Sequence, residues 1–299
     1  MSYRFGEKSG ILSALLLILL LSLPSMALAG HGDSKPVKKG IMLAAFGSSM
    51  PETKVAFESI EKAVKKAFPG VPVRWSYSSS IIRRILDKEG RVVDSPATAM
   101  AKMMDEGFTH VAVQSLHTIP GEEYFGIADT VKGFEGMPKG MKKVTVGKPL
   151  LYSDGDMRRT VAAVIANIPK DRKSSDAVVL MGHGTHHGAN IYYPASQYYF
   201  AQVDPKIFVG TVEGSPTLDD VKKQLKASRT RKVYLMPYMS VAGDHARNDM
   251  AGAEPDSWKS ELTKAGYTCV PVLKGTAEFP EVVDIWVDHL KVAFDHLGE

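Results

Sequence analysis

Residues 177–187 read Ala-Val-Val-Leu-Met-Gly-His-Gly-Thr-His-His, and the fold prediction starts from this stretch. An apolar run of strand length, Ala177 to Met181, stops at a glycine turn that carries three of the chain's nine histidines. We therefore expect a buried strand that delivers imidazole groups to the edge of a sheet.

Strand-like and helix-like segments alternate from Gly40 onward, which is the pattern of an α/β fold with a mostly parallel sheet. The glycine-rich segment 133–140 is predicted to be a loop. Apolar periodicity and turn residues predict strands at 41–46, 71–77, 110–115, 144–151, 177–181, 207–212, 232–239 and 268–273, and helices at 51–68, from 81, 96–106, 154–168, from near 189, 217–227, 256–264 and 280–297.

The two halves of the chain show a weak internal repeat. Gly47 and His183 follow the first strand of each half, and Tyr77 and Glu213 follow the second strand at the same offset. The polar segment 169–175 separates the halves. We predict two similar Rossmann-like α/β domains, 38–172 and 173–299, with a cleft between them and a final helix that packs back on the first domain.

The first 29 residues have the features of a signal peptide. Arg4 and Lys8 precede an apolar run from Ile11 to Leu23, and Ala27-Leu28-Ala29 is a small-residue cleavage signature. A retained membrane anchor is the alternative, but the apolar run is short for a span. We expect the mature protein to begin near Gly30 and to reside in the periplasm.

Composition excludes several classes of function. The formal net charge is +4, and removal of residues 1–29 leaves about +3, which suits an anionic small molecule and does not indicate nucleic acid. The single Cys269 excludes an internal disulfide and covalent haem attachment through a Cys-x-x-Cys-His motif. Motifs of serine hydrolases, nucleotide hydrolases and dehydrogenases are absent from the sequence.

Three residues with metal-ligand chemistry follow successive strands of the second half. His183 follows the first strand, Glu213 the second, and His245 lies in the loop after the third. The carboxyl ends of parallel strands meet at one edge of a sheet, so these side chains are expected to converge. Two imidazoles and a carboxylate with open positions suit a divalent ion such as cobalt, iron, nickel or zinc. The alternative is that all three are solvated loop residues.

The remaining histidines have weaker interpretations. His186 and His187 are either partners that orient a ligating imidazole or surface groups. His289 and His296 are expected to be surface residues of the last helix. His117, at the end of a strand in the first half, is a structural loop residue or, alternatively, an axial ligand of haem.

Aromatic and basic residues near these segments also have two interpretations. Tyr192-Tyr193 and Tyr198-Tyr199-Phe200 either pack in a core or an interface, or stack on a planar macrocycle. Arg83, Arg84 and Arg247 either lie at the surface or bind carboxylates.

Five motifs taken together resemble those of one enzyme family. The sequence is similar to the CbiK-like cobaltochelatases of the anaerobic cobalamin pathway, class II chelatases that insert cobalt into sirohydrochlorin and share the fold of ferrochelatase. The resemblance extends over the expected mature chain and rests on Leu43–Ser48, on Val113–His117 with Pro120–Glu123, on Gly182–Thr185 with His187, on Val212–Gly214 and on Gly243–Met250.

This resemblance implies a sirohydrochlorin-type tetrapyrrole held between two α/β domains, with Co²⁺ or Fe²⁺ as the inserted ion. His183, Glu213 and His245 match the family's metal-binding and catalytic residues, and His183 is expected to accept pyrrole protons. The signal peptide departs from a family expected in the cytoplasm. The alternative function is a periplasmic metal- or haem-binding protein without turnover, with haem as a secondary ligand. We expect a homo-oligomer, and a metal or haem transport system as a further partner.

Overall fold

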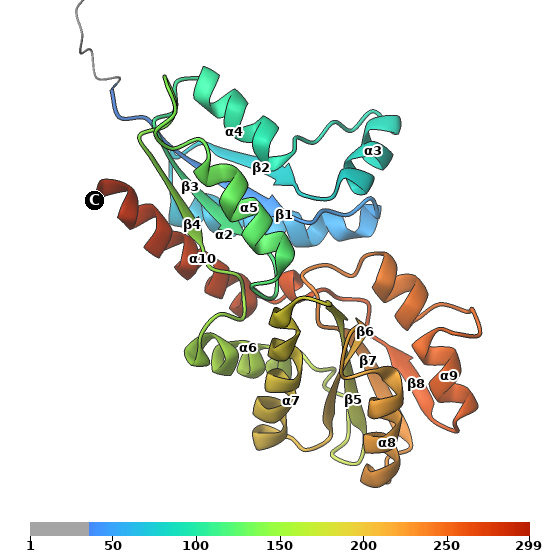
Figure 1. Ribbon diagram of the computed structural model, residues 1–299. Helices are drawn as coiled ribbons and strands as arrows, with labels where there is room; N and C mark the ends of the chain where they lie inside the picture. The colour runs from blue at the N-terminus through green and yellow to red at the C-terminus, as the bar shows by residue number, and fades with distance from the viewer. Residues whose placement is uncertain (1–35) are drawn as a thin grey trace, which may run out of the picture. The chain divides into compact units, whose positions relative to one another are not determined.

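Two four-stranded parallel sheets organise residues 36–299, the part of the chain that the computed structural model describes (Figure 1). The strand orders are β2-β1-β3-β4 and β6-β5-β7-β8, so the same order is built twice along the chain. The α/β fold prediction is confirmed. The strands are β1 (Lys39–Ala45), β2 (Val73–Tyr77), β3 (His110–Ser115), β4 (Lys143–Gly147), β5 (Ala177–Gly184), β6 (Ile207–Glu213), β7 (Lys232–Pro237) and β8 (Thr268–Pro271).

The strands are connected by helices that cover the sheets. Ser79, Ser95 and Ser153 accept hydrogen bonds from backbone N–H groups at the starts of α3, α4 and α6, which satisfies donors that a helix leaves free. The α-helices are α2 (Lys54–Ala67), α3 (Ser80–Lys88), α4 (Pro96–Asp105), α5 (Glu122–Lys132), α6 (Asp154–Ala166), α7 (Tyr192–Val203), α8 (Leu218–Ser228), α9 (Trp258–Lys264) and α10 (Pro280–Asp295).

Helix α5 is an element that the sequence analysis missed. Its buried residues, Tyr124, Ile127 and Val131, have helical spacing, but the helix follows a Pro-Gly pair and contains Gly126. A residue without a side chain inside an eleven-residue segment weakens the helical signal that a sequence gives. The segment is nevertheless helical because its three apolar side chains reach the core.

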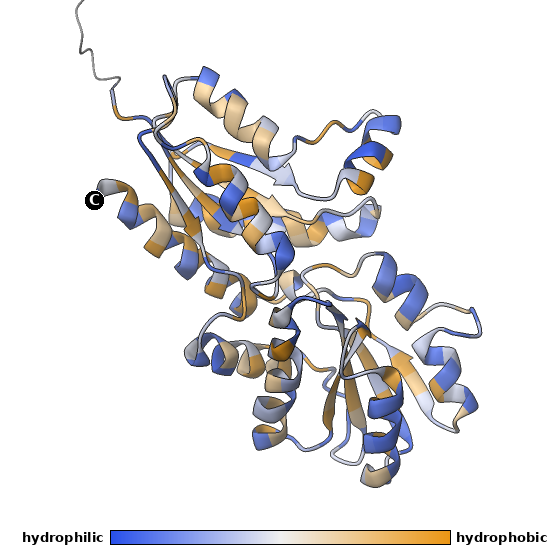
Figure 2. Ribbon diagram, viewed as in Figure 1, coloured by the Kyte–Doolittle hydropathy of each residue, from blue (hydrophilic) through white to orange (hydrophobic). Residues whose placement is uncertain are grey.

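The apolar run of β5 is buried on both faces of its sheet. Ala177, Val179 and Met181 belong to one core cluster, whereas Val178 and Leu180 belong to another. Side chains alternate between the faces of a strand, so a strand covered on both sides is apolar at every position. In Figure 2 the strands are accordingly hydrophobic, and the helices carry hydrophilic residues along their outer surfaces.

The last helix returns to the first sheet. Helix α10 packs against β3, β4 and α2, and Thr145 Oγ1 on β4 donates a hydrogen bond of 2.6 Å to the carbonyl oxygen of Ala293 (Figure 1). Helix α6 packs against both α10 and α7. The apolar face of α10, including Trp286 and Leu290, is therefore covered.

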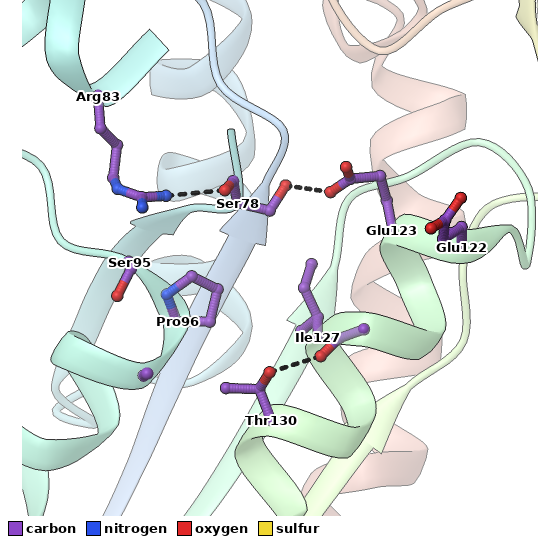
Figure 3. Close-up of a pocket in the computed structure, with 10 residues that line it drawn as sticks. Ser78, Arg83, Ser95, Pro96, Glu122, Glu123, Ile127 and Thr130 are labelled. Atoms are coloured by element: carbon purple, nitrogen blue, oxygen red, sulfur yellow. Dashed lines mark hydrogen bonds between the residues drawn. The ribbon is translucent and has the colours of Figure 1, made fainter. Parts of the chain in front are cut away.

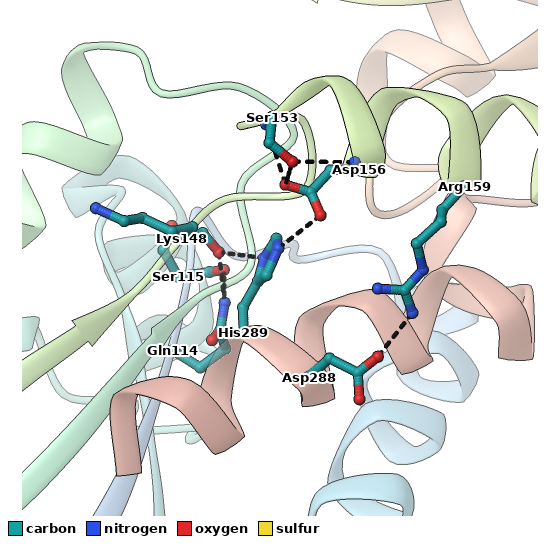
Figure 4. Close-up of polar contacts among 8 residues, drawn as sticks. All are labelled: Gln114, Ser115, Lys148, Ser153, Asp156, Arg159, Asp288 and His289. Carbon is teal, nitrogen blue, oxygen red and sulfur yellow. Dashed lines mark hydrogen bonds and ion pairs between the residues drawn. The ribbon is translucent and has the colours of Figure 1, made fainter. Parts of the chain in front are cut away.

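One surface prediction on this helix was wrong. The side chain of His289 is only 12% exposed, and its two ring nitrogens lie 3.0 Å from the carbonyl oxygen of Lys148 and 3.0 Å from Asp156 Oδ1 (Figure 4). Asp156 belongs to the capping box that starts α6. His289 thus joins α10 to α6 and β4, while His296 is exposed as predicted.

Residues Pro36–Glu299 form one structural unit. The boundary between 172 and 173 stays a prediction, and the signal peptide assigned to 1–29 lies outside the described residues. Within 36–299, no helix has both the length and the apolar character needed to span a membrane.

Candidate metal centre at the edge of the second sheet

His183 lies inside a strand and not after it. Strand β5 continues to Gly184, which pairs with Glu213 at the end of β6, so the strand ends three residues later than expected. The His183 side chain is half-buried, and Nδ1 lies 3.0 Å from the carbonyl oxygen of Gly184. A carbonyl oxygen can only accept, so this contact places the proton on Nδ1.

Tyr193 supports the strand beneath His183. Its ring is 2% exposed and packs directly on Gly182, where a side chain would collide with the ring. Burial raises the pKa of Tyr193 to about 12, and the nearby backbone amides of Gly184 and His183 partly oppose this shift. Tyr193 and Phe200 are therefore core residues, which excludes them as stacking surfaces for a macrocycle in this conformation.

Glu213 is the last residue of β6, and its side chain is exposed. The turn that follows is held by Asn190, whose Nδ2 donates a hydrogen bond of 2.7 Å to the carbonyl oxygen of Ser215. The Asn190 side chain also accepts one of 3.2 Å from the backbone N–H of Thr185. One amide side chain thus ties the end of β5 to the end of β6.

His245 lies at the start of a single-turn π-helix, η3 (Ala246–Met250), after β7. Its ring centroid is 4.7 Å from that of His183, with the two planes at 86°. His245 Nδ1 is 2.5 Å from Asp249 Oδ2. The two histidines that were predicted to follow different strands therefore meet.

Both imidazoles leave the same nitrogen free. Each Nδ1 has an acceptor, whereas within residues 36–299 neither Nε2 forms a hydrogen bond. Ligating histidines commonly have this arrangement, because a bond at one nitrogen fixes the ring and leaves a lone pair on the other. The Glu213 carboxylate does not form a three-residue site with His183 and His245. Among the described residues, no set of three His, Cys, Asp or Glu side chains is close enough to hold a metal ion.

The neighbouring histidines are separate from this pair. His187 Nδ1 accepts a hydrogen bond of 3.1 Å from the backbone N–H of Ala189 and so caps the short 3-10 helix η2 (Gly188–Ile191). Its ring lies 6.0 Å from that of Phe125 on α5. His186 is exposed.

His117 is held in the first half of the chain. Its Nδ1 lies 3.0 Å from Ser115 Oγ, and its Nε2 is buried without a hydrogen-bond partner. Burial lowers the pKa of His117 to about 4, although the charge of Glu123 acts in the opposite direction. A buried Nε2 does not favour the axial-ligand interpretation.

The arginines are largely tied to the backbone. Arg83 donates to the carbonyl oxygens of Tyr77 and Ser78 and lines a hollow of about 370 Å³ together with Ser78 and Glu123, which are joined by a hydrogen bond of 2.6 Å (Figure 3). Arg84 Nε donates to the Ser80 carbonyl oxygen, 3.3 Å away. Arg247 donates to the Ala242 carbonyl oxygen and lies 3.5 Å from Glu52 in the first half.

Two supporting residues escaped the sequence analysis: Asp249 and Asn190. Asp249 had a usable signal, because it lies four residues after His245 and residues with this spacing share a helix face. Asn190 had none, since it acts across strands. For Tyr193, the core-packing interpretation is the one that the structure confirms.

Comparisons with known proteins identify the family of this chain. The family model described as cobalt chelatase (CbiK) matches residues 39–295. The chain belongs to this family. It is 47% identical over 264 residues to the sirohydrochlorin cobaltochelatase CbiKC of Nitratidesulfovibrio vulgaris, covering 88% of this chain and 93% of that protein. It is 33% identical to the sirohydrochlorin cobaltochelatase of Salmonella typhimurium, covering 87% of this chain and 97% of that protein.

A solved structure shares the fold of this family member. SirB from Bacillus subtilis, solved with Fe³⁺, matches with a TM-score of 0.58 at 15% identity, covering 88% of this chain and 98% of SirB. The family model and the two relatives confirm the resemblance to cobaltochelatases seen in the sequence.

Proposed function

We propose that this protein is a sirohydrochlorin cobaltochelatase that takes up a divalent ion at His183, Glu213 and His245 and transfers it into the tetrapyrrole. The observation that carries this proposal is the His183–His245 pair, with rings 4.7 Å apart and both Nδ1 atoms bound to acceptors, in a member of the cobalt chelatase family. Two neutral imidazoles with free Nε2 atoms are suitable ligands for cobalt or iron.

Glu213 completes the ligand set by moving its side chain. Its backbone is fixed by pairing with Gly184 and by the Asn190 clamp, whereas its side chain is exposed and free to rotate. A site that closes only when the ion arrives also releases it readily. Three protein ligands with open positions leave room for the pyrrole nitrogens to replace them.

Insertion of a divalent ion releases two protons from the macrocycle. Imidazole is the side chain whose ordinary pKa lies closest to neutrality, so it suits a base for this step. We assign proton acceptance to His183, and Glu213, at the exposed end of β6, passes a proton to solvent.

The test is metal insertion into sirohydrochlorin, followed by the visible spectrum of the product. His183→Ala and His245→Ala are expected to lower the rate by about 100-fold or more, because each removes a ligand. Glu213→Ala is expected to be similarly impaired, and His186→Ala, an exposed histidine three residues from the pair, serves as the matched control. Full activity in either of the first two variants would contradict the site.

Turnover separates catalysis from carriage of metal or haem. A chelatase forms more than one metallated macrocycle per polypeptide, whereas a binding protein stops at its binding stoichiometry. The same assay with Co²⁺ and Fe²⁺ compares the ions, and titration with haem tests for a second ligand. A wild-type protein that inserts neither ion would overturn the proposal.

We also propose that the protein acts in the periplasm. Support comes from the basic start, the apolar run and the Ala27-Leu28-Ala29 signature. Mass spectrometry of protein from the periplasmic fraction is expected to show a chain that starts near Gly30. An uncleaved chain confined to the cytoplasm would contradict this location.

Exposed apolar residues favour a homo-oligomer. Ile191, Tyr198 and Val203, on η2 and α7, are each more than 60% exposed. Val203 also lines a hollow of about 440 Å³ between α6 and α7, whose other lining residues are mainly apolar. Light scattering is expected to give a multiple of the chain mass.

We also propose that the protein associates with a metal or haem transport system. Co-purification from the periplasm tests this association.

A further inference from the structure

We propose that Asp249 is a positioning residue that fixes the tautomer of His245, so that Nδ1 carries the proton and Nε2 is reserved for the metal ion. This inference rests on the proposed function, because it concerns the same site. It adds a residue that makes no contact with the ion and acts only through the imidazole.

The carboxylate of Asp249 faces the ring of His245. Asp249 Oδ2 lies 2.5 Å from His245 Nδ1, within hydrogen-bond distance. An ionised carboxylate only accepts hydrogen bonds, so the imidazole nitrogen that faces it must carry the proton. The other nitrogen, Nε2, then keeps its lone pair.

Among the described residues, His245 is the one partner of the Asp249 side chain. Within residues 36–299, its carboxylate makes no hydrogen bond or ion pair except the one with His245. The η3 helix has no side-chain cap hydrogen bond, so this carboxylate does not cap the helix start. The Asp249 side chain is 45% exposed and the His245 side chain 33%, and partly exposed pairs of this kind contribute little to stability. The pair is therefore better explained by its effect on the imidazole than by folding.

The tautomer of His183 is also set by an acceptor at Nδ1. Its Nδ1 also faces an acceptor, but that acceptor is the backbone carbonyl of Gly184. The same tautomer is thus selected in both rings of the pair, once by the backbone and once by a side chain. A substitution can remove the acceptor that the Asp249 side chain provides, but not the one that the Gly184 backbone provides. The tautomer of His245 can therefore be tested while that of His183 is left unchanged.

The backbone of η3 brings Asp249 close to His245. A π-helix places five residues in one wide turn, and in η3 this turn carries Asp249 to the ring of His245, four residues earlier. Single-turn π-helices are often found at functional sites. The residue pair Asp244 and Asn248 has the same spacing and is joined by a hydrogen bond of 2.7 Å. Asp244 therefore provides a carboxylate on the same turn that does not contact either histidine.

The decisive variant is Asp249→Asn. Asparagine has the same shape, but its amide oxygen can accept a hydrogen bond from Nδ1–H and its amide nitrogen can donate one to an unprotonated Nδ1, so it permits both tautomers. Asp249→Glu retains a carboxylate and tests rescue. Asp244→Asn removes the same charge from the same turn and is the matched control.

The direct readout is the tautomer of His245 in the full protein with ¹⁵N-labelled histidine. Long-range ¹H–¹⁵N spectra distinguish a proton on Nδ1 from one on Nε2, and the His245→Gln variant assigns the signals. We expect Nδ1–H in the wild type and in Asp244→Asn, and a population with Nε2–H in Asp249→Asn. An unchanged tautomer in Asp249→Asn would overturn the inference.

The kinetic readout compares the apparent KM for Co²⁺ with the KM for sirohydrochlorin. We expect Asp249→Asn to raise the apparent KM for Co²⁺ by about 10- to 100-fold, the usual effect of losing a partner of a metal-bound histidine. The KM for sirohydrochlorin should stay within about twofold, since the proposed role of Asp249 acts only through His245, and Asp249→Glu should recover part of the loss. An unchanged KM for Co²⁺ would contradict the assignment.

Failure of this inference differs from failure of the proposed function. If the wild type inserts cobalt, His245→Ala does not, and Asp249→Asn matches the wild type, only the role of Asp249 is wrong. If the wild type inserts no metal, the proposed function fails, whereas the tautomer spectra still test the hydrogen bond. The thermal midpoint of each variant checks that it is folded.

Discussion

The side chain of Asn190 bridges two strands by accepting a hydrogen bond from the Thr185 backbone and donating one of 2.7 Å to the Ser215 backbone. This bridge closes the ends of β5 and β6 around the positions of His183 and Glu213. The metal site thus depends on a residue that carries no metal-ligand chemistry.

We expect Asn190→Ala to lower the free energy of unfolding by about 1–3 kcal/mol, because two backbone groups lose their partner. The metal-insertion rate should fall further than this loss of stability explains, since the backbone of Glu213 is then held only by its pairing with Gly184. Urea denaturation and steady-state kinetics measure the two effects. Asn167→Ala is the control, because Asn167 links α6 to α10 away from the site; equal rates in both variants would refute a role for the bridge.

A second prediction concerns Gly182, which the buried ring of Tyr193 covers. Gly182→Ala forces the ring or the strand to move, and we expect a destabilisation of about 1–3 kcal/mol, as for other overpacked cores. Because His183 is the next residue, insertion activity should also fall. Gly188→Ala is the matched change, since a side chain at 188 meets nothing within 4 Å. If Gly182→Ala is as stable and active as Gly188→Ala, Tyr193 does not support the site.

The third prediction is a pH dependence of stability from His117. Burial lowers its pKa from 6.5 to about 4 in the folded protein, so between these values the unfolded chain binds the proton more readily. Stability should therefore fall as the pH drops from about 6.5 to 4, by up to about 3 kcal/mol, and not change further from this group below that range.

The free energy of unfolding at pH 7.5 and at pH 4.5 measures this effect. His117→Gln should lessen the difference between the two pH values, whereas His296→Gln, which changes an exposed histidine, should retain it. A difference as large in His117→Gln as in the wild type would show that other groups cause the acid sensitivity.

Much of the fold could be predicted because apolar patterning is a local property. The run 177–181 identified β5, and the alternation of strands and helices identified two parallel sheets. Helix α5 was missed because Gly126 and a preceding Pro-Gly pair weakened its local signal, while its apolar residues are fixed by the core. His289 was misplaced for a related reason, since its partners Asp156 and Lys148 are distant in the sequence.

By itself, the sequence determined the residue types of the site and the strands that precede them, because the carboxyl ends of parallel strands meet at one edge of a sheet. Only the tertiary structure decided that His183 and His245 meet at 4.7 Å, that Glu213 stays apart from them, and that Asp249, Asn190 and Tyr193 hold the group. These relations depend on register and on side-chain contacts between segments far apart in the chain. The opening stretch, 177–187, therefore supplied the first ligand, and the fold supplied the rest of its site.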